Sequence, residues 1–235
     1  YMRGKTKMHR YLVSVILLVA MSAEVGAVTP EIRVGVGAEF ESVVSDENGR
    51  LKGVIAEPYN CLLEGAGYSY EFVTLPLARL VHELRAGNID VGLPLVHDSS
   101  RDDYATFGNT VIKSSYLRIS VRSNQQKPDE PEARYVYVRG FAGRALLRGL
   151  DGRSFEVSEW SQAIAMLRRQ RADYVLITEK TYGALTEFRK TDLIAEKVSD
   201  LNVAFYVRKA LPKLAEALNQ SNNQCQTAKL AETSG

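Results

Sequence analysis

Three residue types are scarce in this sequence of 235 residues, which has two cysteines, three histidines and one tryptophan. No CxxC pair occurs, and His82 and His97 lie far along the chain from both Cys61 and Cys225, so a zinc site built from cysteine and histidine is not expected. The sequence also contains no motif for a catalytic nucleophile, a metal or a cofactor. We therefore predict no catalytic residue, no metal site and no cofactor.

Long hydrophobic runs are scarce as well, and the one that occurs lies near the N-terminus. Residues 12–21 are apolar apart from Ser14, follow four basic residues and precede the small-residue motif Val25-Gly26-Ala27. This pattern is typical of a secretory signal peptide, here residues 1–27, and it predicts a periplasmic protein. A retained anchor is the alternative, although the run has only about half of the roughly 20 apolar residues that a membrane-spanning helix needs.

An excess of positive charge is missing once this leader is set aside. Its removal takes away four of the 30 basic residues and one of the 28 acidic residues, which leaves 26 and 27 and a net charge of about −1. Nucleic-acid binding would require a basic stripe, so no nucleic-acid partner is expected. The two cysteines lie in the part that would be exported, where an oxidising compartment permits a disulfide, but two buried thiols fit the sequence equally well.

Residues 77–95 show the pattern of a helix followed by a strand. Apolar residues recur at helical spacing over 77–84, Gly87-Asn88 supplies the conformation on which helices end, and apolar residues alternate over 89–95. A polar loop that contains Arg101 comes next. Because a guanidinium binds carboxylates and phosphates through paired hydrogen bonds, Arg101 is the leading candidate for ligand binding; a surface ion pair with Asp102 or Asp103 is the alternative.

Strands and helices alternate through the rest of the chain, which predicts the α/β class. The expected strands are 32–36, 68–74, 135–138, 155–158 and 174–177, and the expected helices are 54–64, 144–150, 162–169, 180–189 and 211–230. Residues 110–122 and 202–208 have the alternation of strands that could cross between two lobes, and 124–132 is typical of a linker or surface loop. We predict one lobe from 28–120 with 200–235, and a second from 121–199.

Four loops should meet between these lobes, because they follow the carboxyl ends of predicted strands, where open α/β sheets hold ligands. They are Glu39-Phe40, residues 94–101, residues 139–143 and Thr178-Glu179. In the third loop, the turn from Gly140 and Phe141 to Gly143 leaves backbone N–H groups exposed to an anion. It lacks the full GxGxxG pattern and the Lys-Ser/Thr of a P-loop, so nucleotide binding is disfavoured; a tight turn without a ligand is the alternative.

The order of helix, Gly-Asn-Ile-Asp, strand and arginine loop over residues 77–101 resembles the type 2 periplasmic binding proteins. The particular resemblance is to bacterial extracellular solute-binding family 3, the polar amino-acid-binding branch, and it extends over nearly all of the chain after residue 28. It implies two lobes joined by a hinge of two crossing strands. It also implies that Arg101 grips a ligand carboxylate, that Phe40 stacks on the ligand and that the turn at Gly140 and Phe141 contacts it. For Phe40, an ordinary half-buried loop residue is the alternative reading.

Two positions depart from the family pattern and put an α-amino acid ligand in doubt. The hydroxyl residues that usually precede the arginine are replaced by Leu93-Pro94-Leu95-Val96-His97, although His97 could replace a hydroxyl as a donor. The acidic residue that usually takes the α-amine falls on Thr178, with Glu179 one residue further on. The single tryptophan, Trp160, is expected to begin a helix rather than to line the cleft.

The resemblance implies a non-enzymatic, monomeric periplasmic protein that captures a small carboxylate-bearing, amino-acid-like solute. An ABC-type membrane permease or a sensor would recognise its closed state. One alternative is a periplasmic dehydratase acting on a cyclic carboxylate, in which Glu39, His97 or Glu179 would do the acid-base work. Another is a stand-alone sensor or partner-binding module with a degenerate cleft.

Overall fold

The structure is a computed structural model that describes residues 31–122, 132–147, 153–185, 188 and 192–233. The predicted signal peptide and all but the last residue of the predicted linker lie outside this part of the chain. Within it, no helix combines the length and the apolar character needed to cross a membrane.

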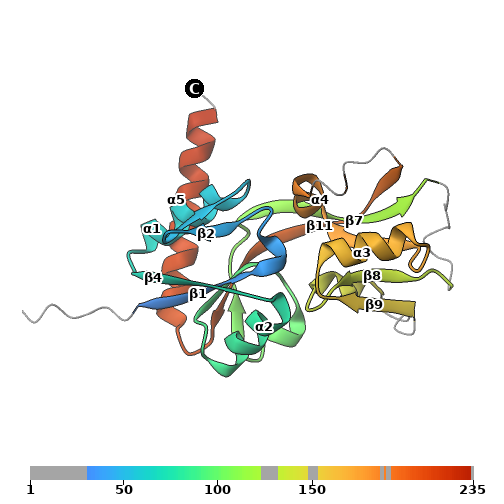
Figure 1. The fold of residues 1–235 in the computed structure, drawn as a ribbon. Helices are drawn as coiled ribbons and strands as arrows, with labels where there is room; N and C mark the ends of the chain where they lie inside the picture. The colour runs from blue at the N-terminus through green and yellow to red at the C-terminus, as the bar shows by residue number, and fades with distance from the viewer. Residues whose placement is uncertain (1–30, 123–131, 148–152, 186–187, 189–191, 234–235) are drawn as a thin grey trace, which may run out of the picture.

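The first lobe is built on a parallel sheet in the order β4-β1-β5. Two helices connect its strands, and a short hairpin precedes the first of them (Figure 1). Its elements are β1 (Ile32–Gly37), η1 (Ala38–Phe40), β2 (Ser45–Glu47), β3 (Arg50–Lys52), α1 (Ala56–Ala66), β4 (Tyr70–Leu75), α2 (Leu77–Ala86), β5 (Val91–Val96), η2 (Ser99–Arg101) and β6 (Ala105–Phe107). Both helices end at a left-handed glycine, Gly67 and Gly87, and the second of these ends is the one predicted from Gly87-Asn88.

The second lobe repeats the alternation on a smaller scale, with β8 lying parallel to both β9 and β10. Its elements are β8 (Tyr135–Val138), η3 (Ala142–Leu147), β9 (Ser154–Val157), α3 (Trp160–Arg168), β10 (Tyr174–Thr178) and α4 (Glu179–Ala184). Each lobe has its own cluster of buried apolar side chains. The first cluster includes Val34, Leu80 and Phe205, and the second includes Val136, Ile164 and Ile177.

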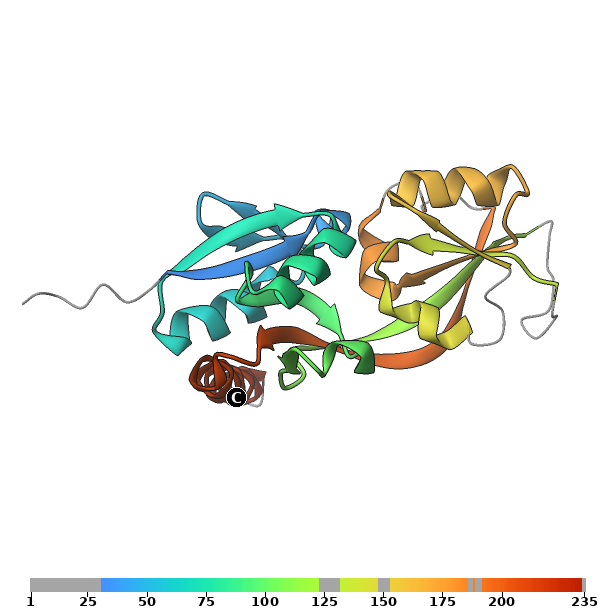
Figure 2. The same cartoon turned by 90° about the horizontal axis from the view of Figure 1, so that it is seen from below.

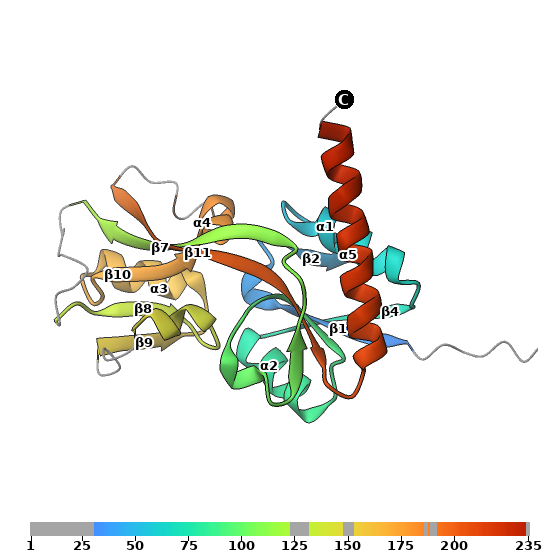
Figure 3. The same ribbon diagram turned by 180° about the vertical axis from the view of Figure 1, so that it is seen from behind.

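Two long antiparallel strands, β7 (Ile112–Val121) and β11 (Leu193–Arg208), join the lobes (Figures 2 and 3). β11 pairs with β5 and β6 of the first lobe, whereas β7 pairs with β10 of the second, so that one sheet runs through the whole molecule. The predicted two-lobe α/β fold with two crossing strands is confirmed. The predicted lobe boundaries fall within or at the ends of β7 and β11, and they remain a prediction.

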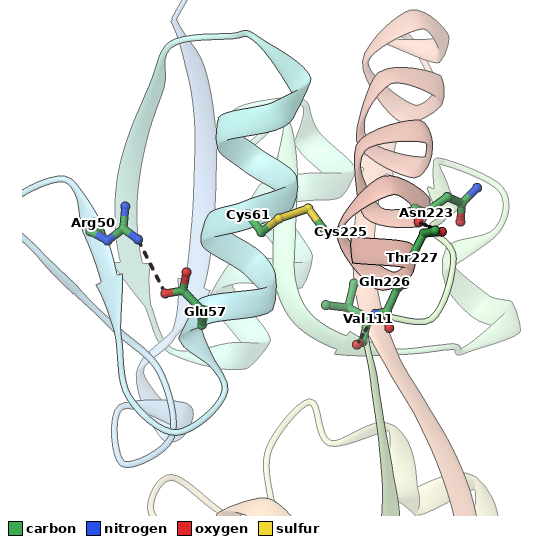
Figure 4. Close-up of a disulfide and its surroundings, with 8 residues drawn as sticks. All are labelled: Arg50, Glu57, Cys61, Val111, Asn223, Cys225, Gln226 and Thr227. Carbon is green, nitrogen blue, oxygen red and sulfur yellow. Dashed lines mark hydrogen bonds and ion pairs between the residues drawn. A yellow bond between two sulfur atoms is a disulfide. The ribbon is translucent and has the colours of Figure 1, made fainter. Parts of the chain in front are cut away.

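Helix α5 (Pro212–Thr233) packs against α1 and then extends beyond it into solvent (Figure 1). Cys225 of α5 forms a disulfide with Cys61 of α1, which decides between the two states left open by the sequence (Figure 4). The amide groups of α5 also hold the chain just before β7. Asn222 donates to the carbonyl oxygens of Asn109 and Thr110, and Gln226 donates to that of Val111 at 3.0 Å.

Three elements differ from their predicted form. The residues after the Gly140 turn form a 3-10 helix as far as Leu147, because Gly143 weakens an α-helix and leaves room for the ring of Phe141. Helix α4 has six residues, Glu179–Ala184, whereas a helix over 180–189 is predicted. β11 begins at Leu193, nine residues before its predicted start, because its largely exposed first half is paired with β7 although it has no apolar alternation.

Candidate functional site

A small cavity of about 40 Å³ lies between the lobes, next to the crossing strands. That volume holds only a few water molecules, so the lobes are nearly closed on each other. Its lining combines first-lobe residues such as Phe40 and Leu77 with second-lobe residues such as Phe141 and Thr178. The arrangement places the cavity at the carboxyl ends of β1, β5, β8 and β10, where the topology predicts a ligand.

Arg101 lies at this cavity and is only 3% exposed. Its guanidinium donates to the carbonyl oxygens of Val96 at 3.1 Å and of Gly140 at 3.3 Å, and it lies over the ring of Tyr206. No carboxylate of the described residues forms an ion pair with it. The alternative of a surface pair with Asp102 or Asp103 is therefore not what the structure contains, and the hydrogen-bond partners of this buried positive charge are backbone carbonyls.

The loop that presents Arg101 is fixed at Asp98. This carboxylate caps η2 by accepting hydrogen bonds from the backbone N–H and the hydroxyl of Ser100, at 3.0 and 2.7 Å. Burial acts to raise the pKa of Asp98, but these hydrogen bonds and the nearby Arg101 outweigh it and hold the pKa below its ordinary value. Tyr206 binds the same residue through its hydroxyl, which accepts from the Asp98 N–H and donates to the Asp98 carbonyl. These hydrogen bonds hold the loop, and Arg101 with it, in place before a ligand binds.

Phe40, also from the first lobe, lines the cavity while its neighbour Glu39 does not. Glu39 points to helix α2, where its carboxylate accepts a 2.7 Å hydrogen bond from the backbone N–H of Leu77. Burial raises the pKa of Glu39, although hydrogen bonds from its own backbone and from Leu77 act in the opposite direction. Glu39 therefore serves as a cap for the first turn of α2.

The turn at Gly140 and Phe141 reaches the cavity from the second lobe. Gly140 has φ +82°, and a Cβ atom there would lie 3.0 Å from the backbone N of Ala78 in α2, so the lobes approach closely at this glycine. Phe141 packs edge-to-face against Tyr116 and Trp160, with ring centroids 5.6 and 5.8 Å away. Burial in this cluster raises the pKa of Tyr116 to about 12, so its hydroxyl stays neutral.

Thr178 lines the cavity, but Glu179 and His97 lie elsewhere. The hydroxyl of Thr178 caps α4 and is within 2.9 Å of the hydroxyl of Thr181. Glu179 is exposed on the first turn of α4. His97 is about half exposed, with its Nε2 3.1 Å from a carboxylate oxygen of Asp102. Of the predicted site residues, the structure gathers Phe40, Arg101, Gly140, Phe141 and Thr178, and leaves Glu39, His97 and Glu179 outside the lining.

Three residues of this region were missed by sequence reasoning. Ser114 of β7 lines the cavity, and its buried hydroxyl has no hydrogen-bond partner among the described residues. Lys180 lines it from α4. Trp160, expected only to begin α3, does begin it, but its indole N–H also donates to the Glu39 carbonyl of the other lobe at 3.0 Å. Lys180 had a sequence signal, because it follows Thr178 closely at a strand end; Ser114 and Trp160 had none.

Comparison with known proteins adds to this geometry. The sequence profile of the bacterial extracellular solute-binding proteins, family 3, matches residues 32–233. No curated protein matches the chain in sequence.

Among solved structures, the arginine-bound form of truncated ArgBP from T. maritima is similar, with a TM-score of 0.69 and 20% identity over 83% of this chain and 96% of that one. A histidine kinase sensor domain with similarity to periplasmic binding proteins gives a TM-score of 0.75 at 17% identity, over 88% of this chain and 94% of that one. The VFT2 domain of BvgS from Bordetella pertussis gives 0.67 at 20% identity, over 86% and 91%. At these identities the likeness shows the fold.

Proposed function

The chain belongs to the bacterial extracellular solute-binding proteins of family 3, and from this premise we propose that it captures a small carboxylate-bearing solute between its lobes. The single observation that carries the proposal is Arg101, which is buried at the interlobe cavity without an anionic partner among the described residues. A buried charge is costly unless it is paired. A ligand carboxylate would supply the missing pair.

The proposed mechanism is capture by closure. In an open form, the ligand would bind Arg101 on the first lobe, and closure would then add contacts from the turn at Gly140 and Phe141 on the second. Two hydrogen bonds already join the lobes, from Arg101 to Gly140 and from Trp160 to Glu39. A ligand shifts the open–closed equilibrium only by its differential affinity for the two forms, so contacts with both lobes are required.

We further propose that the protein works in the periplasm and that its closed state is recognised by an ABC-type permease or by a sensor. Family membership supports an extracellular or periplasmic setting. The similar structures include the substrate binding protein of an amino acid ABC transporter and a histidine kinase sensor domain. The fold therefore supports either kind of partner. The role is proposed as non-enzymatic, because Glu39, His97 and Glu179, the candidates for acid-base work, do not line the cavity.

A substitution of Arg101 tests this proposal. The purified protein is first screened by thermal shift against amino acids, dicarboxylates and other small solutes, since a ligand present at 100 times its dissociation constant adds about 2.7 kcal/mol to stability. Binding of the best carboxylate is then measured by calorimetry. Arg101→Ala is expected to weaken it by about 2 kcal/mol or more, because an enclosed charged pair loses one partner.

Arg169→Ala is the matched control, because Arg169 is exposed at the end of α3 and away from the cavity. The control should bind as the parent protein does. Equal affinity in Arg101→Ala and Arg169→Ala would refute the assigned role of Arg101. Conversion of the carboxylate to a product, rather than its recovery unchanged, would refute the non-enzymatic role.

A further inference from the structure

The charged side chains that the structure describes in the cavity lining are all of one sign. Among the described residues of its lining, Arg101 and Lys180 are the charged side chains, and no carboxylate is present. The only polar side chain there that is buried without a partner is the hydroxyl of Ser114, which can donate a hydrogen bond to an anion. A ligand anion would therefore meet two positive side chains in this lining, while Asp98, which interacts electrostatically with Arg101, lies outside it.

A wider groove of about 520 Å³ continues outward from the cavity and carries the same sign of charge. The two spaces share Ile55, Ile112 and Lys180 in their walls, so they adjoin. Lys113 at the start of β7 and Lys229 of α5 also line the groove, again without a carboxylate among the described lining residues. Lys180 belongs to the second lobe and the other two lysines to β7 and α5, so the groove would change shape when the lobes move.

Among the described residues, no carboxylate lines this space to pair with a ligand ammonium group. Glu39 is turned to the N-terminus of α2, where Leu77 donates to it, and it is absent from the lining. Glu179 is exposed and lies outside both walls. Thr178, which takes the place where an acidic residue was expected, has its hydroxyl engaged with Thr181. A ligand ammonium would be left close to Arg101 and Lys180 without a compensating charge.

From these three observations we infer that the ligand is an acidic solute with two anionic groups and no amine, such as a linear dicarboxylate. One carboxylate would bind Arg101 and Ser114 in the inner cavity, and the other would lie in the groove near Lys180 and Lys113. The inner cavity is too small for a whole solute of this kind, whereas cavity and groove together are not. This inference rests on the proposed function and names the class of solute that it would capture.

Three matched series of compounds test the inference, each differing in one group. They are the dicarboxylates succinate, glutarate and adipate; their amino analogues aspartate, glutamate and 2-aminoadipate; and the monocarboxylates butyrate, valerate and hexanoate. Calorimetry gives the affinities. Fluorescence of Trp160 reports closure, because this single tryptophan makes a hydrogen bond between the lobes.

The best dicarboxylate is expected to bind about tenfold or more tightly than both its amino analogue and its monocarboxylate, as one partly buried charge interaction of about 1.4 kcal/mol would give. Lys180→Gln should remove most of the preference for the dicarboxylate over the monocarboxylate. Lys213→Gln removes the same charge at an exposed position outside both walls, and it should leave that preference unchanged.

The outcomes separate this inference from the proposed function. Tighter binding of the amino analogues, with a change in Trp160 fluorescence, would overturn the inference and uphold solute capture. Equal affinities for a dicarboxylate and its monocarboxylate would overturn the role of the lysines that line the groove, and would leave the proposed function standing. Absence of binding by all three series and by the other solutes of the thermal-shift screen would overturn both.

Discussion

Gly140 is a single residue on which closure of the cleft depends. Its positive φ costs an L-residue about 1 kcal/mol or more, and an added Cβ would lie 3.0 Å from the Ala78 nitrogen and 3.1 Å from the Ala78 Cα across the cleft. We expect Gly140→Ala to lower stability by about 1 kcal/mol and also to weaken ligand binding by about tenfold, because the closed form becomes crowded. Chemical denaturation and calorimetry measure the two effects.

Gly49 provides the matched control, because it has a similar φ of +79° with no atom near an added Cβ. Gly49→Ala should lose a comparable amount of stability and keep its ligand affinity. If Gly140→Ala bound ligand as tightly as Gly49→Ala, the approach of Gly140 to Ala78 would have no part in closure.

The residues of the site differ in how far sequence could predict them. Arg101 and Phe40 could be predicted because each lies in the loop that follows a buried strand, and strand ends converge in an open sheet. Glu39, adjacent to Phe40, turns away because the first turn of α2 needs a hydrogen-bond acceptor. The partner of Trp160 lies 121 residues earlier in the chain, and only the folded arrangement of the two lobes brings them together.

At the scale of elements, helix α2 holds the site in place through its end as well as its beginning. Glu83 near its C-terminus accepts a 2.6 Å hydrogen bond from the Asn88 side chain and pairs with Arg79. The Asn88 hydrogen bond, followed by nearby positive charges, holds the pKa of Glu83 below its ordinary value of 4.5. The interactions of ionised Glu83 therefore connect α2 to the turn that leads into β5.

The sign of the pH dependence follows from this lowered pKa. A carboxyl group that binds its proton less readily in the folded state stabilises the protein above its unfolded pKa, and this contribution is lost as the pH falls through the folded pKa. Glu83→Gln should thus be less stable than the parent at pH 7, and the difference should shrink below about pH 4.5. Urea unfolding across this range measures it.

The same substitution at the exposed Glu216 of α5, which has no ion pair among the described residues, is the control. A constant difference between Glu83→Gln and the parent from pH 7 to pH 3 would contradict the role given to the ionised carboxylate.

The ends of helices and strands can be predicted from the sequence where a particular residue type determines them. Gly67 and Gly87 end their helices, and Asn48-Gly49 turns the hairpin between β2 and β3, because these positions require positive φ. The first half of β11 had no such signal. Most of its side chains are exposed and its apolar residues do not alternate, and it is a strand because β7 offers a paired edge along residues 193–203.

At the scale of the whole molecule, the disulfide between Cys61 and Cys225 connects positions 164 residues apart. A link that closes so long a loop restricts the unfolded chain and is expected to stabilise the protein by about 2 to 5 kcal/mol. The Cys61→Ser/Cys225→Ser variant should unfold at a correspondingly lower urea concentration, and a reducing agent should bring the parent protein to the same value.

The double variant is also the control for the reagent, since a reducing agent should leave its own stability unchanged. Two reactive thiols in the denatured, unreduced parent would contradict the link itself. The sequence left open whether the two cysteines are bridged or are buried thiols, because only the packing of α5 on α1 brings them within reach of each other.

Helix α5 is attached to both of the crossing strands. β11 leads into it, and Asn222 donates to the segment that enters β7, as does Gln226 (Figure 4 shows Gln226 beside Val111). A displacement of the projecting end of α5 would therefore act on both strands at once, while the disulfide keeps this helix attached to α1. A protein that binds this end and favours one cleft geometry would change solute affinity, and by linkage the solute would change the affinity of that protein by an equal factor.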